Sequence, residues 1–189
     1  QHVGNWPGVT VEKKEGKFKF DGNIYNVVDL PGTYSLGAFS EDEMVARDFI
    51  LTGNPDVVIN VIDATNIERN LYLTTQLLEM GVKVIVVLNM FDEARERNIQ
   101  FGINALSKKL GVPVVTTVAS KRKGIDELVD AIVELIDKDI ELKPNIFYGD
   151  EIDKEIETLR KILSGKISEY PPRWVAIKLV EGDQYMHDL

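Results

Sequence analysis

The sequence predicts an α/β fold, and two observations support this prediction. Three short runs are rich in β-branched residues and lack a clean polar alternation, as strands buried on both faces of a parallel sheet do. These runs span 56–63, 82–88 and 112–118. Helix-like patterns separate and follow them, at 67–80, 103–110 and 125–136. Strands that alternate with helices in this way indicate a parallel sheet flanked by helices.

The first expected element is a β-hairpin. Residues 17–20 alternate polar and apolar, Asp21-Gly22-Asn23 is a strong turn signal, and 24–28 continues as the second strand. We expect the hairpin to add one antiparallel edge strand to the otherwise parallel sheet. Further along, Gly81 and Gly111 follow the first two helical patterns, where helix C-caps belong.

The C-terminal part of the chain changes character. Residues 150–163 have the pattern of a charged amphipathic helix, and Pro171-Pro172 begins another helix that runs through Leu179. We therefore predict two domains, an α/β domain over 1–142 and a small, incomplete helical domain over 143–189.

Composition excludes several classes of function. The chain has 189 residues and a net charge of -9, and it contains no long Lys/Arg block, so we expect no nucleic-acid partner. The absence of cysteine excludes a disulfide scaffold, a thiolate metal site and a Cys nucleophile. No apolar run approaches the roughly 18 to 20 residues that span a bilayer, so we expect a soluble polypeptide. That expectation is compatible with its being part of a membrane protein.

The segment Asn89-Met90-Phe91-Asp92 closes the second buried strand and carries the first functional signal. At a strand's carboxyl end, the Asp92 carboxylate can accept hydrogen bonds from the N1 and N2 donors of guanine, and Asn89 can approach N7. Adenine does not offer this pattern, and a site built on such bonds rejects the wrong base strongly. The structural alternative for Asn-x-x-Asp is a helix cap or an Asx-turn.

A second signal, Asp29-Leu30-Pro31-Gly32, directly follows the hairpin. Nucleotide hydrolases place Asp-x-x-Gly beside the terminal phosphate. Asp29 would hold Mg²⁺ through water, since a hard cation that retains waters needs a carboxylate there, and the Gly32 N–H would contact the phosphate. The alternative is a Pro-Gly turn closed by an aspartate.

Two weaker signals accompany these segments. Thr10 lies just before the hairpin, where a nucleotide-sensing loop carries a Thr that ligates Mg²⁺ and contacts the γ-phosphate. A Thr at this place is otherwise simply a good β-former. Val118-Ala119-Ser120 follows the third buried strand, and the Ala119 N–H can point at guanine O6. The alternative there is an ordinary β-to-α turn.

Together these segments resemble a known family. They occur in the order and with the separations that Ras-like GTPase domains require: Thr10, 29–32, 89–92 and 118–120. Three longer stretches closely resemble FeoB-type ferrous iron transporters, at 2–16, 29–36 and 63–73. The resemblance extends through about Asp139, and the C-terminal helices resemble the family's nucleotide-release-inhibiting helical domain. It implies a Ras-like P-loop GTPase fold, mostly parallel with one antiparallel edge strand, followed by a small all-helical domain.

The resemblance also implies roles for residues. Thr10 and Gly32 would serve catalysis, and Thr10 and Asp29 would hold Mg²⁺. The guanine nucleotide, GTP or GDP, would contact Asp29, Gly32, Asn89, Met90, Asp92, Val118, Ala119 and Ser120. The family also allows a monovalent cation. The implied protein is a GTPase module on the cytoplasmic face of the cell membrane, attached to the membrane permease portion of the same polypeptide, which transports Fe²⁺. The resemblance allows an oligomer in the membrane but does not fix the oligomeric state.

The sequence departs from the family pattern in four places. The phosphate-binding Gly-x-x-x-x-Gly-Lys-[Ser/Thr] loop does not occur in it, and we expect that loop immediately before Gln1. Thr33 stands where Ras-like enzymes carry a water-orienting Gln. Met90 replaces a Lys that packs along the nucleotide, and Val118 replaces a Ser that braces the guanine loop. We therefore expect slow turnover and loose nucleotide binding.

Two alternative functions follow from the same residues. One is a soluble GTPase of the ribosome-assembly or tRNA-modification type, which shares the guanine and Asp-x-x-Gly motifs. The other is a non-catalytic interaction module that keeps the fold with a degenerate nucleotide site.

Overall fold

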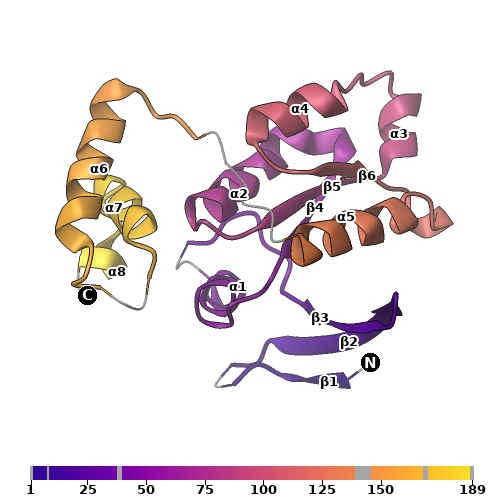
Figure 1. The fold of residues 1–189 in the computed structure, drawn as a ribbon, viewed down its shortest axis with the longest axis horizontal. Coiled ribbons are helices and arrows are strands. Elements are labelled where there is room, and N and C mark those ends of the chain that lie inside the picture. The colour runs from indigo at the N-terminus through magenta and orange to yellow at the C-terminus, as the bar shows by residue number, and fades with distance from the viewer. Residues whose placement is uncertain (1, 8, 38–39, 139–145, 168–169, 188–189) are drawn as a thin grey trace. The chain divides into compact units, whose positions relative to one another are not determined.

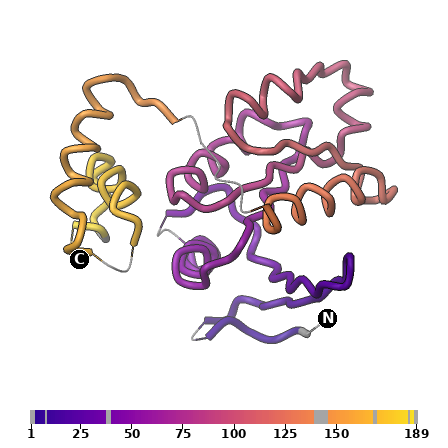
Figure 2. The backbone as a smooth tube through the Cα atoms, in the orientation of Figure 1, coloured from indigo at the N-terminus to yellow at the C-terminus, as the bar shows by residue number. Residues whose placement is uncertain are grey.

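The structure is a computed structural model that describes residues 2–7, 9–37, 40–138, 146–167 and 170–187 (Figures 1 and 2). Its chain forms two compact units, residues 1–53 and 54–189, and each is described here by itself.

The first unit is built on an antiparallel sheet. Its strands are β1 (His2–Asn5), β2 (Glu12–Phe20) and β3 (Asn23–Asp29), in the order β1-β2-β3. The predicted hairpin is confirmed, since β2 pairs with β3 in a register that runs from Lys14↔Asp29 to Phe20↔Asn23. Asp21 and Gly22 turn the chain with φ of 45° and 79°. The turn sequence therefore fixes this register locally.

The predicted single mixed sheet is not what the described strands form. They make two three-stranded sheets, one antiparallel and one parallel. The physical reason is that a turn and an alternating pattern specify a hairpin, but neither specifies which strand pairs with its outer edge. The α/β fold class itself is confirmed.

Helix α1 (Glu41–Thr52) completes the first unit. The Ser40 side chain caps it by accepting a hydrogen bond from the Glu43 N–H at 3.2 Å, and its first turn is acidic. Phe49 of α1 packs edge-on against Trp6, with ring centroids 5.2 Å apart. This contact anchors the helix to the segment that follows β1.

The second unit contains the predicted parallel sheet and its helices. The strands are β4 (Val58–Asp63), β5 (Val84–Asn89) and β6 (Val114–Thr116), in the order β4-β5-β6. The helices are α2 (Ile67–Glu79), α3 (Phe91–Glu96), α4 (Ile103–Leu110) and α5 (Ile125–Asp137), with 3₁₀ helices η1 (Ala64–Asn66) and η2 (Ala119–Lys121). The predicted glycines end helices as expected, because Gly81 and Gly111 adopt φ of 73° and 74° after α2 and α4.

The core of this unit surrounds β5. Residues 84–88 are all buried, and Ile85 and Val87 pack against Ile132 and Leu135 of α5. Figure 1 shows α4 and α5 on opposite sides of the sheet. The face of β4 toward α2 carries a buried polar pair, in which Asn60 Nδ2 donates to Thr74 Oγ1 at 2.7 Å. Burial of β5 on both faces explains why this strand lacks an alternating pattern.

In the described part of the C-terminal region, from residue 146 to 187, the second unit contains three helices. They are α6 (Asp150–Leu163), α7 (Pro172–Val180) and α8 (Gln184–His187), so the two helices predicted here are confirmed. Ile156 of α6 packs with Ala176 and Ile177 of α7. The predicted domain boundary at 142–143 lies outside the described residues. Within the described residues, no helix is long and apolar enough to cross a membrane.

Candidate functional site

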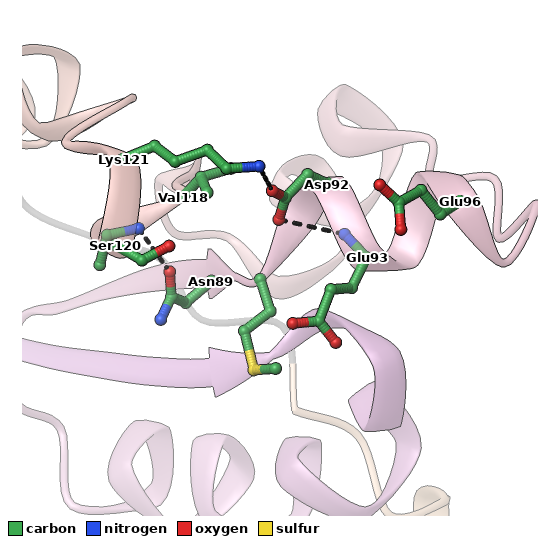
Figure 3. A pocket seen from close by; sticks show the side chains of 9 residues that line it. Asn89, Asp92, Glu93, Glu96, Val118, Ser120 and Lys121 are labelled. Atoms are coloured by element: carbon green, nitrogen blue, oxygen red, sulfur yellow. Dashed lines mark hydrogen bonds and ion pairs between the residues drawn. The ribbon is translucent and has the colours of Figure 1, made fainter.

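The candidate site lies where two parallel strands end. The carboxyl ends of parallel strands meet at one edge of a sheet, and ligands bind there in α/β folds. The loops after β5 and β6 enclose a pocket of about 420 Å³ (Figure 3). Its lining is Asn89, Met90, Asp92, Glu93, Glu96, Val118, Ala119, Ser120 and Lys121. The structure thus brings together all six predicted residues of these two loops.

Asn89 connects the two loops. Its Oδ1 accepts hydrogen bonds from the Ala119 N–H at 3.0 Å and from Thr117 Oγ1 at 3.1 Å. Thr117 is itself fixed by the β5 segment, since its N–H donates to the Leu88 carbonyl at 2.8 Å and its carbonyl accepts from the Phe91 N–H at 3.2 Å. The Asn89 side chain therefore braces the loop after β6 and does not act as the helix cap of the structural alternative.

The Ala119 N–H points to Asn89, whereas we expected it to point at a ligand oxygen. The reason is that Asn89 Oδ1, which comes from the neighbouring strand end, satisfies this exposed donor. The bond also holds Ala119 at the pocket wall.

Asp92 is the charged acceptor of the pocket. It is the second residue of α3, after Met90, whose left-handed backbone (φ 56°) turns the chain from β5 into the helix. Asp92 Oδ1 accepts from the Glu93 N–H at 3.1 Å, and Oδ2 accepts from Lys121 Nζ at 2.5 Å (Figure 3). The hydrogen bond from Lys121 lowers the pKa of Asp92, and the same bond raises the pKa of Lys121. Asp92 is therefore held in its ionised form.

The loop after β6 is closed by its own backbone. Val118 and Lys123 exchange two hydrogen bonds, of 3.0 and 3.2 Å, and Arg122 adopts φ 53° between them. Gly124 follows with φ 77°, and a Cβ added to it would lie 2.1 Å from the Thr116 carbonyl oxygen. Only glycine fits this close approach without displacing the end of β6.

The remaining predicted residues lie in the first unit. Asp29 ends β3 opposite Lys14, and Thr10 lies two residues before β2, so both lie at the same end of the antiparallel sheet. Asp29, Gly32 and Thr10 are exposed, and Thr10 Oγ1 donates to Glu41 of α1 at 3.4 Å. A carboxylate and a hydroxyl are oxygen ligands of the kind that Mg²⁺ takes. Within the described residues, no cluster of three or more His or acidic side chains could hold a metal alone.

Thr33, the residue after Gly32, uses its hydroxyl in two local hydrogen bonds. Thr33 Oγ1 donates to the Ser35 carbonyl at 2.6 Å and accepts the Ser35 N–H at 3.2 Å. The Ser35 hydroxyl in turn donates to Glu43 of α1. Glu41 and Glu43 therefore contact this region, and the sequence prediction missed them together with α1.

The sequence prediction also missed Lys121 and Thr117. Both contact residues that lie 28 or 29 positions away in the chain. No local pattern distinguishes a lysine that pairs with a distant aspartate.

Comparison with known proteins identifies two matching family models. The model described as ferrous iron transport protein B matches residues 1–132, and the model of the FeoB cytosolic helical domain matches residues 148–189. The Fe(2+) transporter FeoB of Escherichia coli K12 is 45% identical over 190 residues, covering 98% of this chain. The chain spans only 24% of that relative's length.

Solved structures show the same similarity. The cytosolic domain of the T. maritima FeoB iron transporter in a GDP form has a TM-score of 0.92 and 43% identity, covering 99% of this chain and 74% of that one. The same domain in a GMPPNP form also has a TM-score of 0.92 and covers the same shares, with 42% identity. The cytosolic domain of L. pneumophila FeoB has a TM-score of 0.89 and 37% identity, covering 100% of this chain and 74% of that one.

Proposed function

Because this chain belongs to the FeoB family of ferrous iron transport proteins, we propose that it binds guanine nucleotides and hydrolyses GTP slowly. Its role would be the regulatory cytosolic part of a transporter that carries Fe²⁺ as cargo. The observation that carries the proposal is the convergence of Asn89, Asp92 and Ala119 on one pocket. Relatives in this family have been crystallised with GDP and with GMPPNP.

Base selection follows from the donors and acceptors in the pocket. The ionised Asp92 carboxylate offers two acceptor oxygens to the N1 and N2 donors of guanine. Asn89 Oδ1 is committed to the loop, so its Nδ2 is the atom that would donate to N7. Adenine lacks the N1 proton and presents an amino group where guanine has O6. Its binding would form neither of these charge-assisted hydrogen bonds to Asp92, so the pocket favours guanine over adenine.

We place the phosphate and Mg²⁺ functions on the first unit. Thr10 and Asp29 would hold Mg²⁺, and the Gly32 N–H would donate to the γ-phosphate. Mg²⁺ supplies charge neutralisation of the phosphate oxygens during transfer. Hydrolysis should be slow because Thr33 is engaged with Ser35 and offers no side chain to orient water. GTP hydrolysis that persists unchanged in Thr10→Ala, or without Mg²⁺, would contradict these roles.

We also propose the organisation of the longer protein. Residues 1–142 would form the GTPase domain and 143–189 part of the helical domain, on the cytoplasmic face of the membrane. The permease portion would belong to the same polypeptide, in keeping with the 24% of the E. coli relative that this chain spans. Family membership favours this function over a soluble ribosome-assembly or tRNA-modification GTPase. A degenerate, non-catalytic nucleotide site is the remaining alternative, and measurements of nucleotide binding test it.

Calorimetric titration of the purified protein with GDP and ADP tests the proposal. We expect GDP to bind at least about 100-fold more tightly than ADP, since the pocket hydrogen-bonds groups that only guanine carries. Comparable affinities for the two nucleotides would contradict guanine recognition. The absence of binding to either would support the non-catalytic module.

A further inference from the structure

We propose that Lys121 determines specificity in the base pocket, because its pairing with Asp92 lets the site accept hypoxanthine nucleotides as well as guanine nucleotides. This inference rests on the proposed function. It extends the substrate class from guanine nucleotides to 6-oxopurine nucleotides that lack the 2-amino group.

Protein groups already donate hydrogen bonds to the Asp92 carboxylate, which we propose binds the base. Lys121 comes from η2, and its side chain reaches across to Asp92 of α3, with Nζ 2.5 Å from Oδ2 (Figure 3). The other oxygen, Oδ1, accepts the Glu93 N–H at 3.1 Å. Each carboxylate oxygen therefore has a donor from the protein before any base arrives, and each has a further lone pair to offer.

The chemical difference between guanine and hypoxanthine determines how much affinity is lost when hypoxanthine binds. Guanine and hypoxanthine share O6, N7 and the N1 proton, and they differ only in the 2-amino group. Guanine gives the carboxylate two donors and hypoxanthine gives one. A recognition site usually rejects the base with the missing donor because one of its own polar atoms is left unpaired. At this site, whichever oxygen loses the amino group keeps a partner from the chain.

The charges around the pocket make Lys121 the more important of the two partners. The lining contains three acidic side chains, Asp92, Glu93 and Glu96, and Lys121 is its only basic one. Without the Lys121 ammonium group, the Asp92 carboxylate would lie beside Glu93 and Glu96 and would have no positively charged partner in the pocket lining. A hypoxanthine base would then give it only one hydrogen bond. Both members of the pair are partly exposed, at 58% for Lys121 and 30% for Asp92, so the effect amounts to a few-fold.

The test compares affinities for GDP and IDP in the wild-type protein and in Lys121→Met. We expect the ratio of the IDP dissociation constant to the GDP dissociation constant to rise by about two- to fivefold in Lys121→Met. Lys123→Met is the matched control, since it removes the same charge from the same loop but its side chain lines a neighbouring pocket. Lys123→Met should keep the wild-type ratio. Lys121→Arg should also keep it, because arginine retains the positive charge.

The outcomes separate this inference from the proposed function. Suppose that GDP binds more tightly than ADP, but that the ratio of the IDP dissociation constant to the GDP dissociation constant is the same in Lys121→Met and wild type. Lys121 then does not set specificity. An equal rise of the ratio in Lys123→Met would also overturn the inference, because loop charge alone would explain it. If the wild-type protein does not bind GDP, both the inference and the proposed function fail.

Discussion

At the scale of single residues, the acceptor oxygens of Asn89 and Asp92 already have partners before a base is bound. Asn89 Oδ1 accepts two hydrogen bonds and both Asp92 oxygens accept one each. A bound base therefore donates to oxygens that already accept hydrogen bonds from the protein, and not to unpaired oxygens. Each new bond thus contributes only a modest net free energy. The benefit lies in selectivity, because the acceptors are fixed in position before the ligand arrives.

Gly124 is the residue whose replacement should disturb this arrangement most. Its added Cβ would lie 2.1 Å from the Thr116 carbonyl oxygen and 3.1 Å from Thr117 Cα, and Thr117 holds Asn89. We predict that Gly124→Ala lowers the free energy of unfolding by about 1–3 kcal/mol beyond the cost of the left-handed backbone, and that it weakens GDP binding. Urea unfolding and calorimetry measure the two effects.

Gly81 provides the control for Gly124. It adopts nearly the same backbone, φ 73° against 77°, but a Cβ added to it has nothing within 4 Å. Gly81→Ala therefore carries the left-handed strain alone, about 1–2 kcal/mol, without the clash. Equal destabilisation by the two substitutions, with GDP affinity unchanged in both, would show that the close approach at Thr116 does not position the loop.

At the scale of elements, the sequence predicts those whose pattern is strong and local. The helices at 67–79 and 150–163 appear as expected because periodic apolar residues face a core. Helix α1 was missed although Ser40-Glu41-Asp42-Glu43 has the form of a capping box, and Ser40 does cap it. Strand β1 has only four residues and is stabilised by pairing with β2, so no local sequence pattern predicts it.

The C-terminal end of α2 carries a buried carboxylate with a predictable pH dependence. Glu79 is 6% exposed and accepts a hydrogen bond from the Tyr148 hydroxyl. Burial raises the pKa of Glu79 above its ordinary value of 4.5, and the Tyr148 hydrogen bond opposes that rise. The other charged groups that act on it are Lys178, Glu181 and Arg173. The native state therefore binds a proton here more readily than the unfolded state.

The sign of the effect on stability follows from this difference in proton binding. As pH rises from about 4.5 through the raised pKa of Glu79, the unfolded state loses its proton first, so stability falls. We predict that Glu79→Gln removes this loss. Its free energy of unfolding relative to wild type should increase across that window, as measured by thermal unfolding at several pH values.

An exposed carboxylate on α6 gives the comparison. Glu155→Gln alters a solvent-exposed side chain of similar size, and so reports the effect of an ordinary substitution. If Glu79→Gln differs from wild type by the same amount at every pH in the window, burial does not raise the pKa of Glu79.

At the scale of the whole molecule, the positions of the two loops that line the pocket were predictable, but the contacts between these loops were not. The prediction worked because alternating strands and helices imply a parallel sheet, and the carboxyl ends of parallel strands share one edge. Asn89 and Ala119 therefore had to be near each other. The bonds that Lys121 makes to Asp92 and Thr117 makes to Asn89 depend on side-chain placement across 29 and 28 residues, which no local pattern encodes.

The central claim is that Asp92 selects the base by accepting hydrogen bonds from guanine. Xanthine carries an oxygen in place of the 2-amino group, so a carboxamide that donates one bond and accepts one would match it. The Asp92→Asn variant should therefore lose GDP affinity and gain XDP affinity, whereas Glu96→Gln, which removes a charge from the same pocket, should keep the wild-type preference. Titration of the three proteins with GDP and XDP measures this directly. A reversal confined to Asp92→Asn is the predicted result, and an Asp92→Asn variant that still prefers GDP as strongly as wild type would contradict the account.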